Sequence, residues 1–295
     1  MRAFIYDKYG YYPDEENVTS FTYNGWFYKL EISEKNDQEI HSLRLLLEEI
    51  NRNFTEVGTD IIRARDGHYV TMSNYGPVVL VAVKEGKVNI DLLIKIHFLF
   101  INRFDNVSLK ISHLRSLWIN KIETIKERIL PLLEKDNFDA YVLSQYALSM
   151  AENALAYLLD TIYIYGDEVI IKTLVHKRIE EFDSFYLFNP FNLIIDSPTR
   201  DFSFLYKGGF ISLEKLNIIM DNYNFKGQEA SLLLARSMYP DYIFDIIEDY
   251  YELKKDIKQK AKNSLVNLDN HIFKLKKLHN LLIKKYSIKP ISFLK

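Results

Sequence analysis

The pattern of hydrophobic and polar residues divides the chain into a strand-rich beginning and a helical remainder. From Val18 to Ile32 apolar and polar positions alternate on both sides of Asn24-Gly25, a dipeptide that tolerates the positive φ angles of a tight hairpin turn. A second turn signal, Asp66-Gly67, lies between two more strand-like runs, and a continuous apolar run follows them. These three runs span residues 60–64, 68–72 and 78–83.

One amphipathic helix is expected among these strands. Asn36 and Asp37 can cap its first turn, and the residues after them place apolar side chains at helical spacing while Glu39 stays on the polar side. The apolar positions are Ile40, Leu43, Leu47, Ile50 and Phe54. The N-terminal part is therefore predicted to hold about five strands, with one helix inserted after the second or third.

Strand signals fade after Gly86, and helical periodicity takes over. Helices are expected to begin near residues 89–91 and to cover residues 109–133, 141–164, 213–223, 227–238, 242–262 and 265–286. Two short strand-like runs, 169–175 and 185–188, interrupt them. The pattern predicts an α+β protein with a strand-rich N-terminal lobe over residues 1–86 and a helical C-terminal lobe over residues 87–295.

Composition narrows the classes of protein to consider. A chain of 295 residues, 48% of them apolar, can bury a core large enough for two lobes. A formal charge of −2 gives no overall attraction to nucleic acid, and the longest apolar stretch, 92–101, is too short for a membrane span. The absence of cysteine excludes disulfides and thiolate sites, and we expect a cytoplasmic protein.

Common catalytic motifs are missing. The sequence has no P-loop, no Rossmann fingerprint, no His-Glu-x-x-His and no Gly-x-Ser-x-Gly pattern. Its seven histidines are scattered, and none has a partner at the close helical spacing of a metal-binding pair. Zincin and serine-hydrolase chemistry therefore has no support in the sequence.

Several short motifs resemble those of one kinase-like group. They are Val175-His176 at a strand end, Arg200-Asp201 followed by Phe202 to Tyr206, and Ala235-Arg236 with Tyr239-Pro240 downstream. With the order of strands and helices, they resemble the aminoglycoside phosphotransferase and choline kinase type, and most of all the spore-coat-associated kinase-like proteins of spore-forming bacteria. The resemblance implies a two-lobed protein-kinase-like fold, with a small antiparallel-sheet N-lobe carrying one helix and a larger, mostly helical C-lobe.

The same resemblance implies a degenerate catalytic loop. An active member of the group has an aspartate base two residues after the counterpart of His176, where this chain has Arg178, and a metal-binding asparagine about five residues later, where Asp183 stands. The metal-binding aspartate should end the next strand. Counting back from the Arg-Asp motif places Asn189 there, with Asp196 as a second candidate. A guanidinium in place of the base and an amide in place of the metal-binding carboxylate would be expected to impair phosphoryl transfer severely.

The resemblance also implies nucleotide contacts in the N-lobe. Lys29 lies near the place of the phosphate-contacting lysine, with Glu39 as its helix partner, or else Glu48 or Glu49. A solvated lysine and a solvated helix face explain these residues equally well. The resemblance gives Arg200-Asp201 a structural role, in which the aspartate holds the loop after the metal site.

Strand alternation places Lys29 on the same face as Phe27 and Glu31. His176 also has a simpler interpretation, as a side chain that hydrogen-bonds within its loop. Lysines concentrate toward the C-terminus, opposite an apolar helical stripe, and indicate either a solvated face or a patch for an acidic partner. Tyrosines do not alternate with arginines, so we expect no nucleic-acid partner.

Three hypotheses remain open. The leading one is a catalytically impaired kinase-like protein, a pseudokinase that acts by binding protein partners or in assembly and is incorporated in the spore coat, with no cofactor. The alternative is an active small-molecule phosphotransferase that uses ATP and magnesium with relocated residues, in which Asp183 and Asp196 hold the metal and His176 lies near the transferred phosphate. The third is an unrelated interaction protein.

Overall fold

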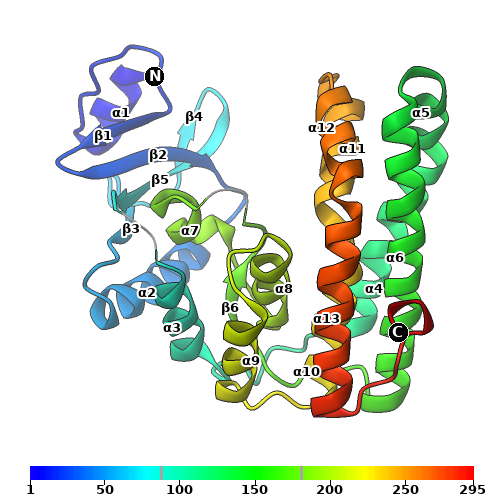
Figure 1. Cartoon of the computed structure of the whole chain (residues 1–295). Helices are drawn as coiled ribbons and strands as arrows, with labels where there is room; N and C mark the ends of the chain where they lie inside the picture. Colours follow the sequence, from blue (N-terminus) through cyan, green and yellow to red (C-terminus); the bar gives the residue numbers. More distant parts are fainter. Residues whose placement is uncertain (87–88, 180–181) are drawn as a thin grey trace. The chain divides into compact units, whose positions relative to one another are not determined.

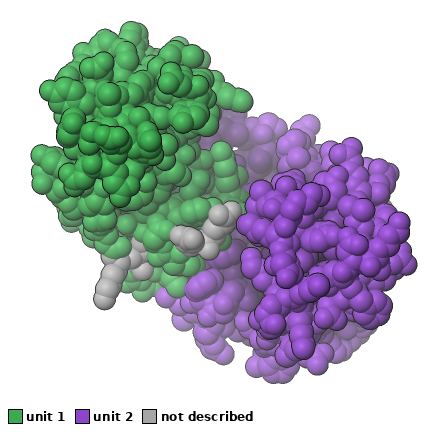
Figure 2. Space-filling view, turned by 90° about the horizontal axis from the view of Figure 1, so that it is seen from above, with its two compact units in different colours: residues 1–99, 174–194 green, residues 100–173, 195–295 purple. Residues whose placement is uncertain are grey.

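The computed structural model describes residues 1–86, 89–179 and 182–295, and these residues form two compact units. Unit 1 consists of residues 1–99 and 174–194, and unit 2 of residues 100–173 and 195–295. Figure 1 labels their helices and strands, and Figure 2 colours unit 1 green and unit 2 purple. The units follow contacts in space, so segment 174–194 belongs with the N-terminal sheet although it lies far along the chain. The predicted lobe boundary after residue 86 stays a prediction.

Unit 1 is built on an antiparallel sheet of five strands in the order β1-β2-β5-β3, with β4 also paired to β5. The strands are β1 (Ser20–Tyr23), β2 (Trp26–Ile32), β3 (Thr59–Ile62), β4 (Thr71–Ser73) and β5 (Gly76–Lys84). In the described part of the chain β3 and β4 each pair with β5 rather than with each other, so the hairpin predicted at Asp66-Gly67 is wrong as a strand pair. Gly67 does make a tight turn there, with φ of 90°.

The first hairpin and the helix after it confirm the sequence prediction. Asn24 and Gly25 join β1 to β2 with φ angles of 50° and 75°, the left-handed region that this dipeptide tolerates. Helix α2 (Asp37–Asn53) begins after Asn36, whose side chain accepts hydrogen bonds from the backbone N–H groups of residues 38 and 39.

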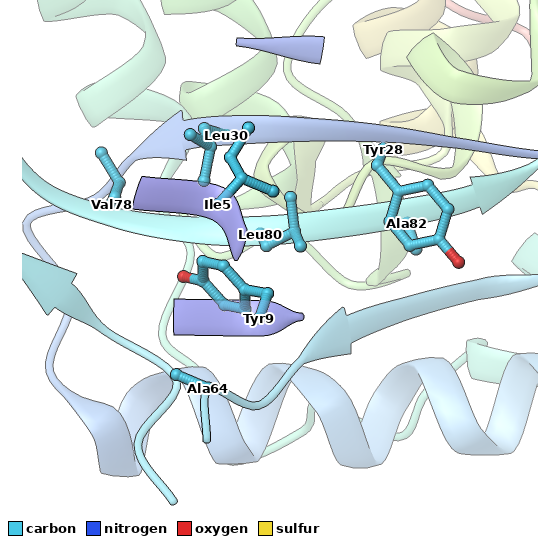
Figure 3. Packing of buried hydrophobic residues seen from close by; sticks show 8 residues of the cluster. All are labelled: Ile5, Tyr9, Tyr28, Leu30, Ala64, Val78, Leu80 and Ala82. Atoms are coloured by element: carbon cyan, nitrogen blue, oxygen red, sulfur yellow. The ribbon is translucent and has the colours of Figure 1, made fainter. Parts of the chain in front are cut away.

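A short helix that the sequence analysis missed covers one face of this sheet. Helix α1 (Arg2–Tyr9) buries Ile5 and Tyr9, one turn apart, against side chains of β2 and β5 (Figure 3). The other members of this core cluster are Tyr28, Leu30, Ala64, Val78, Leu80 and Ala82. Only two of the eight residues in α1 are buried, so its sequence lacks the repeated apolar stripe that reveals a longer helix.

The segment after β6 (Thr173–His176) differs from the prediction. Residues 185–188 were expected to be extended, but they form helix α7 (Ser184–Phe188), followed by the 3-10 turn η2 (Pro190–Asn192) and strand β7 (Leu193–Asp196), which pairs with β6. Asp183 explains the helix, because its side chain accepts a hydrogen bond from the Tyr186 N–H and so caps the first turn. Helix α3 (Ile90–Phe100) confirms the helical stretch expected after residue 89.

Unit 2 is helical. Helix α6 (Phe138–Tyr165) contacts α4, α5, α10, α11 and α12, and its small residues Ala147, Ala151 and Ala154 are fully buried, as close helix packing requires. The other helices are α4 (Ile111–Thr124), the π-helical turn η1 (Ile125–Ile129), α5 (Leu130–Asp136), α8 (Thr199–Lys207), α9 (Leu213–Asn222), α10 (Gly227–Met238), α11 (Asp241–Leu253), α12 (Lys258–Val266), α13 (Leu268–Tyr286) and the 3-10 turn η3 (Ser292–Leu294).

Two predictions for the helices of unit 2 need correction. The helix expected over residues 242–262 is two helices, α11 and α12, because Lys254 adopts a left-handed conformation with φ of 53° and ends the first. Helix α8 was not predicted at all. None of the helices in the described ranges is long and apolar enough to cross a membrane.

Candidate functional site

Lys29 lies on a buried face of the unit 1 sheet, the face opposite helix α1. In the β2–β5 register Phe27, Lys29 and Glu31 stand opposite Val83, Val81 and Val79, all three of which are fully buried. Lys29 Nζ lies 3.0 Å from Glu31 Oε1. Residues two apart on a strand point to the same face, so this ion pair confirms the alternation predicted for Phe27, Lys29 and Glu31. We call this surface the Lys29 face.

Glu31, on the same strand, is the carboxylate that pairs with Lys29. Glu39 instead reaches back along α2, where its Oε2 accepts a hydrogen bond of 2.9 Å from the Asn36 N–H and completes a capping box. Glu48 pairs with Arg44 at 2.8 Å. Sequence reasoning looked for a helix partner and overlooked Glu31, although the two-residue spacing was a sufficient signal.

Helix α7 lies on the Lys29 face. The Phe185 ring meets the Phe27 ring edge-on at a centroid distance of 4.9 Å, and Lys29 Nζ lies 5.5 Å from the centre of the Phe185 ring. At the other end of the helix, the Thr59 hydroxyl donates a hydrogen bond of 2.8 Å to the Phe188 carbonyl. Side chains of β2 and β3 thus hold the two ends of α7.

Asn189 ties the end of α7 to the same strand as Lys29. Its side chain is 2% exposed, and its Nδ2 donates a hydrogen bond of 2.9 Å to Glu31 Oε1 while its Oδ1 accepts one of 3.0 Å from the Phe191 N–H. An amide supplies both a donor and an acceptor, whereas an ionised carboxylate supplies only acceptors. The residue type at this position therefore matches its two partners.

The catalytic-loop candidates have separate local roles in the structure. His176 is buried, and its Nε2 donates a hydrogen bond of 2.8 Å to the carbonyl of Leu187, which agrees with the simpler interpretation of a loop hydrogen bond. Arg178 is exposed, and Asp183 caps α7 through an accepted hydrogen bond of 2.6 Å. Residues 177–192 separate β6 from β7, so counting a few positions on from His176 ends in the α7 segment.

The strand that was expected to end at Asn189 ends at Asp196 instead. Strand β7 runs from Leu193 to Asp196, so the count back from the Arg-Asp motif was wrong and the second candidate occupies the strand-end position. The count failed because α8 begins only three residues after Asp196, which left a shorter connection than we assumed.

In unit 2 two arginines surround the Asp196 carboxylate. Arg236 Nη2 lies 2.9 Å from each carboxylate oxygen, and Arg200 Nη1 lies 3.0 Å from Oδ2. Asp196 and Arg236 are 7% and 8% exposed. Burial lowers the pKa of the Arg236 guanidinium, and the negative charge of Asp196 opposes that effect. The pair is thus a buried, hydrogen-bonded ion pair with a third, more exposed member.

These contacts bear on whether the predicted residues fit a magnesium ion. Mg²⁺ takes oxygen ligands, with carboxylates as its usual protein donors. Both oxygens of Asp196 face a guanidinium, and the Asn189 oxygen accepts a backbone N–H. As arranged, neither residue directs a free oxygen toward an ion. Asp201, which was expected to be structural, is buried in the first turn of α8 beside Arg200.

A family model described as spore coat putative kinase YutH matches residues 2–282. The chain belongs to this family. Among solved structures, it is similar to an aminoglycoside phosphotransferase from Alicyclobacillus acidocaldarius, with a TM-score of 0.61, 11% identity and coverage of 92% of this chain and 94% of that one. A spectinomycin phosphotransferase in complex with ADP and spectinomycin has a TM-score of 0.44 and 12% identity, covering 94% of this chain and 92% of that one. None of the curated proteins is significantly similar in sequence.

The family match and the first structural similarity confirm the kinase-like fold that the sequence predicted. The similarity in structure extends over nearly the whole of both chains, so it covers both units. At 11% identity it shows the fold and leaves the chemistry to be argued from the residues.

Proposed function

We propose that this YutH-family protein is a kinase-fold protein that acts by binding and does not transfer phosphoryl groups. One observation carries the proposal: the carboxylate at the end of β7, Asp196, is held by two guanidinium groups. Phosphoryl transfer relies on positioned cations that offset charge on the phosphates, and a magnesium-binding carboxylate is the usual means of placing one of them. A carboxylate already neutralised by arginines is poorly suited to that task.

The loop before β7 supports the same proposal. Arg178 stands where the resemblance calls for a carboxylate base, and a guanidinium stays protonated at neutral pH and cannot accept the proton of an acceptor hydroxyl. Asp183, the alternative metal ligand, caps helix α7. The residues needed for the alternative hypothesis, an ATP- and magnesium-dependent phosphotransferase, therefore have other structural roles.

The family description connects the fold with the spore coat. We propose that the protein works in the assembly of the coat, through protein partners, and that it is made in the cytoplasm and becomes part of that layer. A tagged copy expressed during sporulation should fractionate with coat extracts and co-purify with other coat proteins after mild cross-linking. Recovery only from the vegetative cell lysate would contradict this part of the proposal.

The absence of catalysis is tested by calorimetric titration of the purified protein with ATP, with and without magnesium, followed by an ADP-release assay with small alcohols and aminoglycosides. We expect no dependence of nucleotide binding on magnesium and no release of ADP above the rate in the absence of protein. Magnesium-dependent binding with turnover would instead establish the phosphotransferase, and substitution of Asp183 and Asp196 would then locate its metal.

A further inference from the structure

Helix α7 packs against the surface of the sheet that carries Lys29, and the residues whose contacts are described below all belong to unit 1. Phe185 lies against Phe27 and Lys29 at one end of the helix. Just beyond the other end, Asn189 donates a hydrogen bond to Glu31. The segment therefore packs over part of β2, through Phe27 and Glu31, and contacts β5 as well, while the Lys29 side chain stays 40% exposed.

The C-terminal half of the segment, residues 187–189, is tightly packed. Leu187 and Phe188 are 1% and 6% exposed, and Asn189 is 2% exposed. Two hydrogen bonds join the segment to the sheet, from Thr59 to the Phe188 carbonyl and from Asn189 to Glu31. The Lys29 ammonium pairs with Glu31 and faces an aromatic ring, so its charge is already balanced within the unit.

We propose that residues 184–189 form a built-in plug that occupies the Phe27 side of the Lys29 face while leaving the Lys29 side chain 40% exposed, and that an anionic ligand with a planar ring system, such as a nucleotide, can stack on Phe27 and pair with Lys29 at the same time only when this plug moves away. This inference deepens the proposed function, because it adds an already occupied ring-stacking surface to the missing base and the arginine-bound carboxylate. It concerns access for a ligand and is independent of whether the bound ligand reacts.

The contacts indicate how the plug could be released. A ligand that stacked on Phe27 and paired with Lys29 would replace the two contacts that Phe185 makes, so the plug and the ligand compete for the same partners. The apparent dissociation constant is then the intrinsic one divided by the fraction of molecules with the plug displaced. Weakening the plug should therefore tighten binding without any change at Lys29.

Two variants weaken the plug through different contacts. Phe185→Ala removes the ring that lies on Phe27 and Lys29, and Thr59→Val removes the hydrogen bond to the Phe188 carbonyl while keeping the side-chain volume. Phe273→Ala is the matched control, because Phe273 also lies near a lysine, 4.3 Å from Lys277 Nζ, but is 55% exposed on helix α13 in unit 2. Each protein is titrated with ATP, and hydrogen exchange is followed in peptides covering residues 184–189.

We expect faster exchange at 184–189 in both plug variants, and an ATP affinity on the order of tenfold higher in Phe185→Ala than in the wild type or in Phe273→Ala, as the loss of an aromatic and a cation–π contact predicts. Equal ATP affinity in the wild type and both plug variants, together with faster exchange, would overturn the plug. Thr59→Val gives the same comparison if Phe185→Ala fails to fold.

The outcome is separable from that of the proposed function. Tighter ATP binding without ADP release would support both the plug and the non-catalytic proposal. Tighter binding accompanied by ADP release would support the plug and overturn the non-catalytic proposal. Strong ATP binding by the wild type without turnover would overturn the plug alone.

Discussion

Asn189→Asp tests the idea that the amide at position 189 is required by its neighbours. The substitution replaces the Nδ2 donor, 2.9 Å from Glu31 Oε1, with a second carboxylate oxygen. Losing a hydrogen bond to a charged group costs about 1.5–3 kcal/mol. The new carboxylate at position 189 and that of Glu31 would also repel each other, by at most about 4 kcal/mol for two charges about 4 Å apart at an effective dielectric constant of about 20. The partial exposure of Glu31 reduces this repulsion.

We therefore expect Asn189→Asp to lower the free energy of unfolding by about 3–5 kcal/mol at neutral pH. Urea denaturation followed by circular dichroism measures the change, provided the slope with urea stays constant. The matched control is Glu31→Gln, which should cost less than about 1 kcal/mol, because it removes a half-exposed ion pair with Lys29 while its amide oxygen still accepts from Asn189.

The double variant makes the test decisive. In Glu31→Gln with Asn189→Asp, the new glutamine amide can donate to the new carboxylate, so most of the lost stability should return and the two substitutions should be coupled by at least about 2 kcal/mol. If Asn189→Asp were neutral, or cost the same with Gln at position 31, the assignment of Asn189 to Glu31 would be refuted.

Three further predictions concern buried charge and helix capping. Arg236→Gln should cost about 3–5 kcal/mol because it leaves Asp196 buried beside a single partner, whereas Arg200→Gln, with a side chain 31% exposed, should cost less than about 1 kcal/mol in the same urea assay. Burial lowers the pKa of His271 from 6.5 to about 4, so its neutral form stabilises the fold fully above pH 6.5 and up to about 3 kcal/mol is lost as the pH falls toward 4. Thermal melts across this range should show a shallower pH dependence for His271→Phe. Asn36→Ala should lower stability by about 1 kcal/mol, measured by urea denaturation.

Features specified by a few neighbouring residues were predictable from the sequence. The φ angles tolerated by Asn24-Gly25 located the first hairpin, and Asn36 located the start of α2. Alternation along β2 correctly placed Lys29 on the same face as Glu31. In each case the deciding interaction lies within a few residues, so the local pattern contained the information.

Features that depend on distant partners were not predictable in this way. Residues 185–188 are apolar and aromatic, which suits a strand or a buried helix equally, and the cap at Asp183 decided between them. Counting back from Arg200-Asp201 chose Asn189 for the strand end because it assumed a longer connection than the one that joins β7 to α8. Arg236, 40 residues from Asp196, gave no signal in the sequence that it would engage that carboxylate.

Under the proposed non-catalytic function, the residues at the kinase-like positions should be fitted to their surroundings in this protein. Asn189 fits because Glu31 needs a donor, and Asp196 is compatible with burial because Arg236 neutralises it. Introducing a single carboxylate, for instance at Arg178, would leave the Asp196 ion pair and the contacts of helix α7 with the Lys29 face unchanged. A protein that had only recently lost its catalytic residues would retain a site that one substitution could repair, since its other groups would still be arranged for the reaction. Here Asn189 and Asp196 each have partners that match their side chains, which supports the proposal of a fold maintained for its surface and its stability.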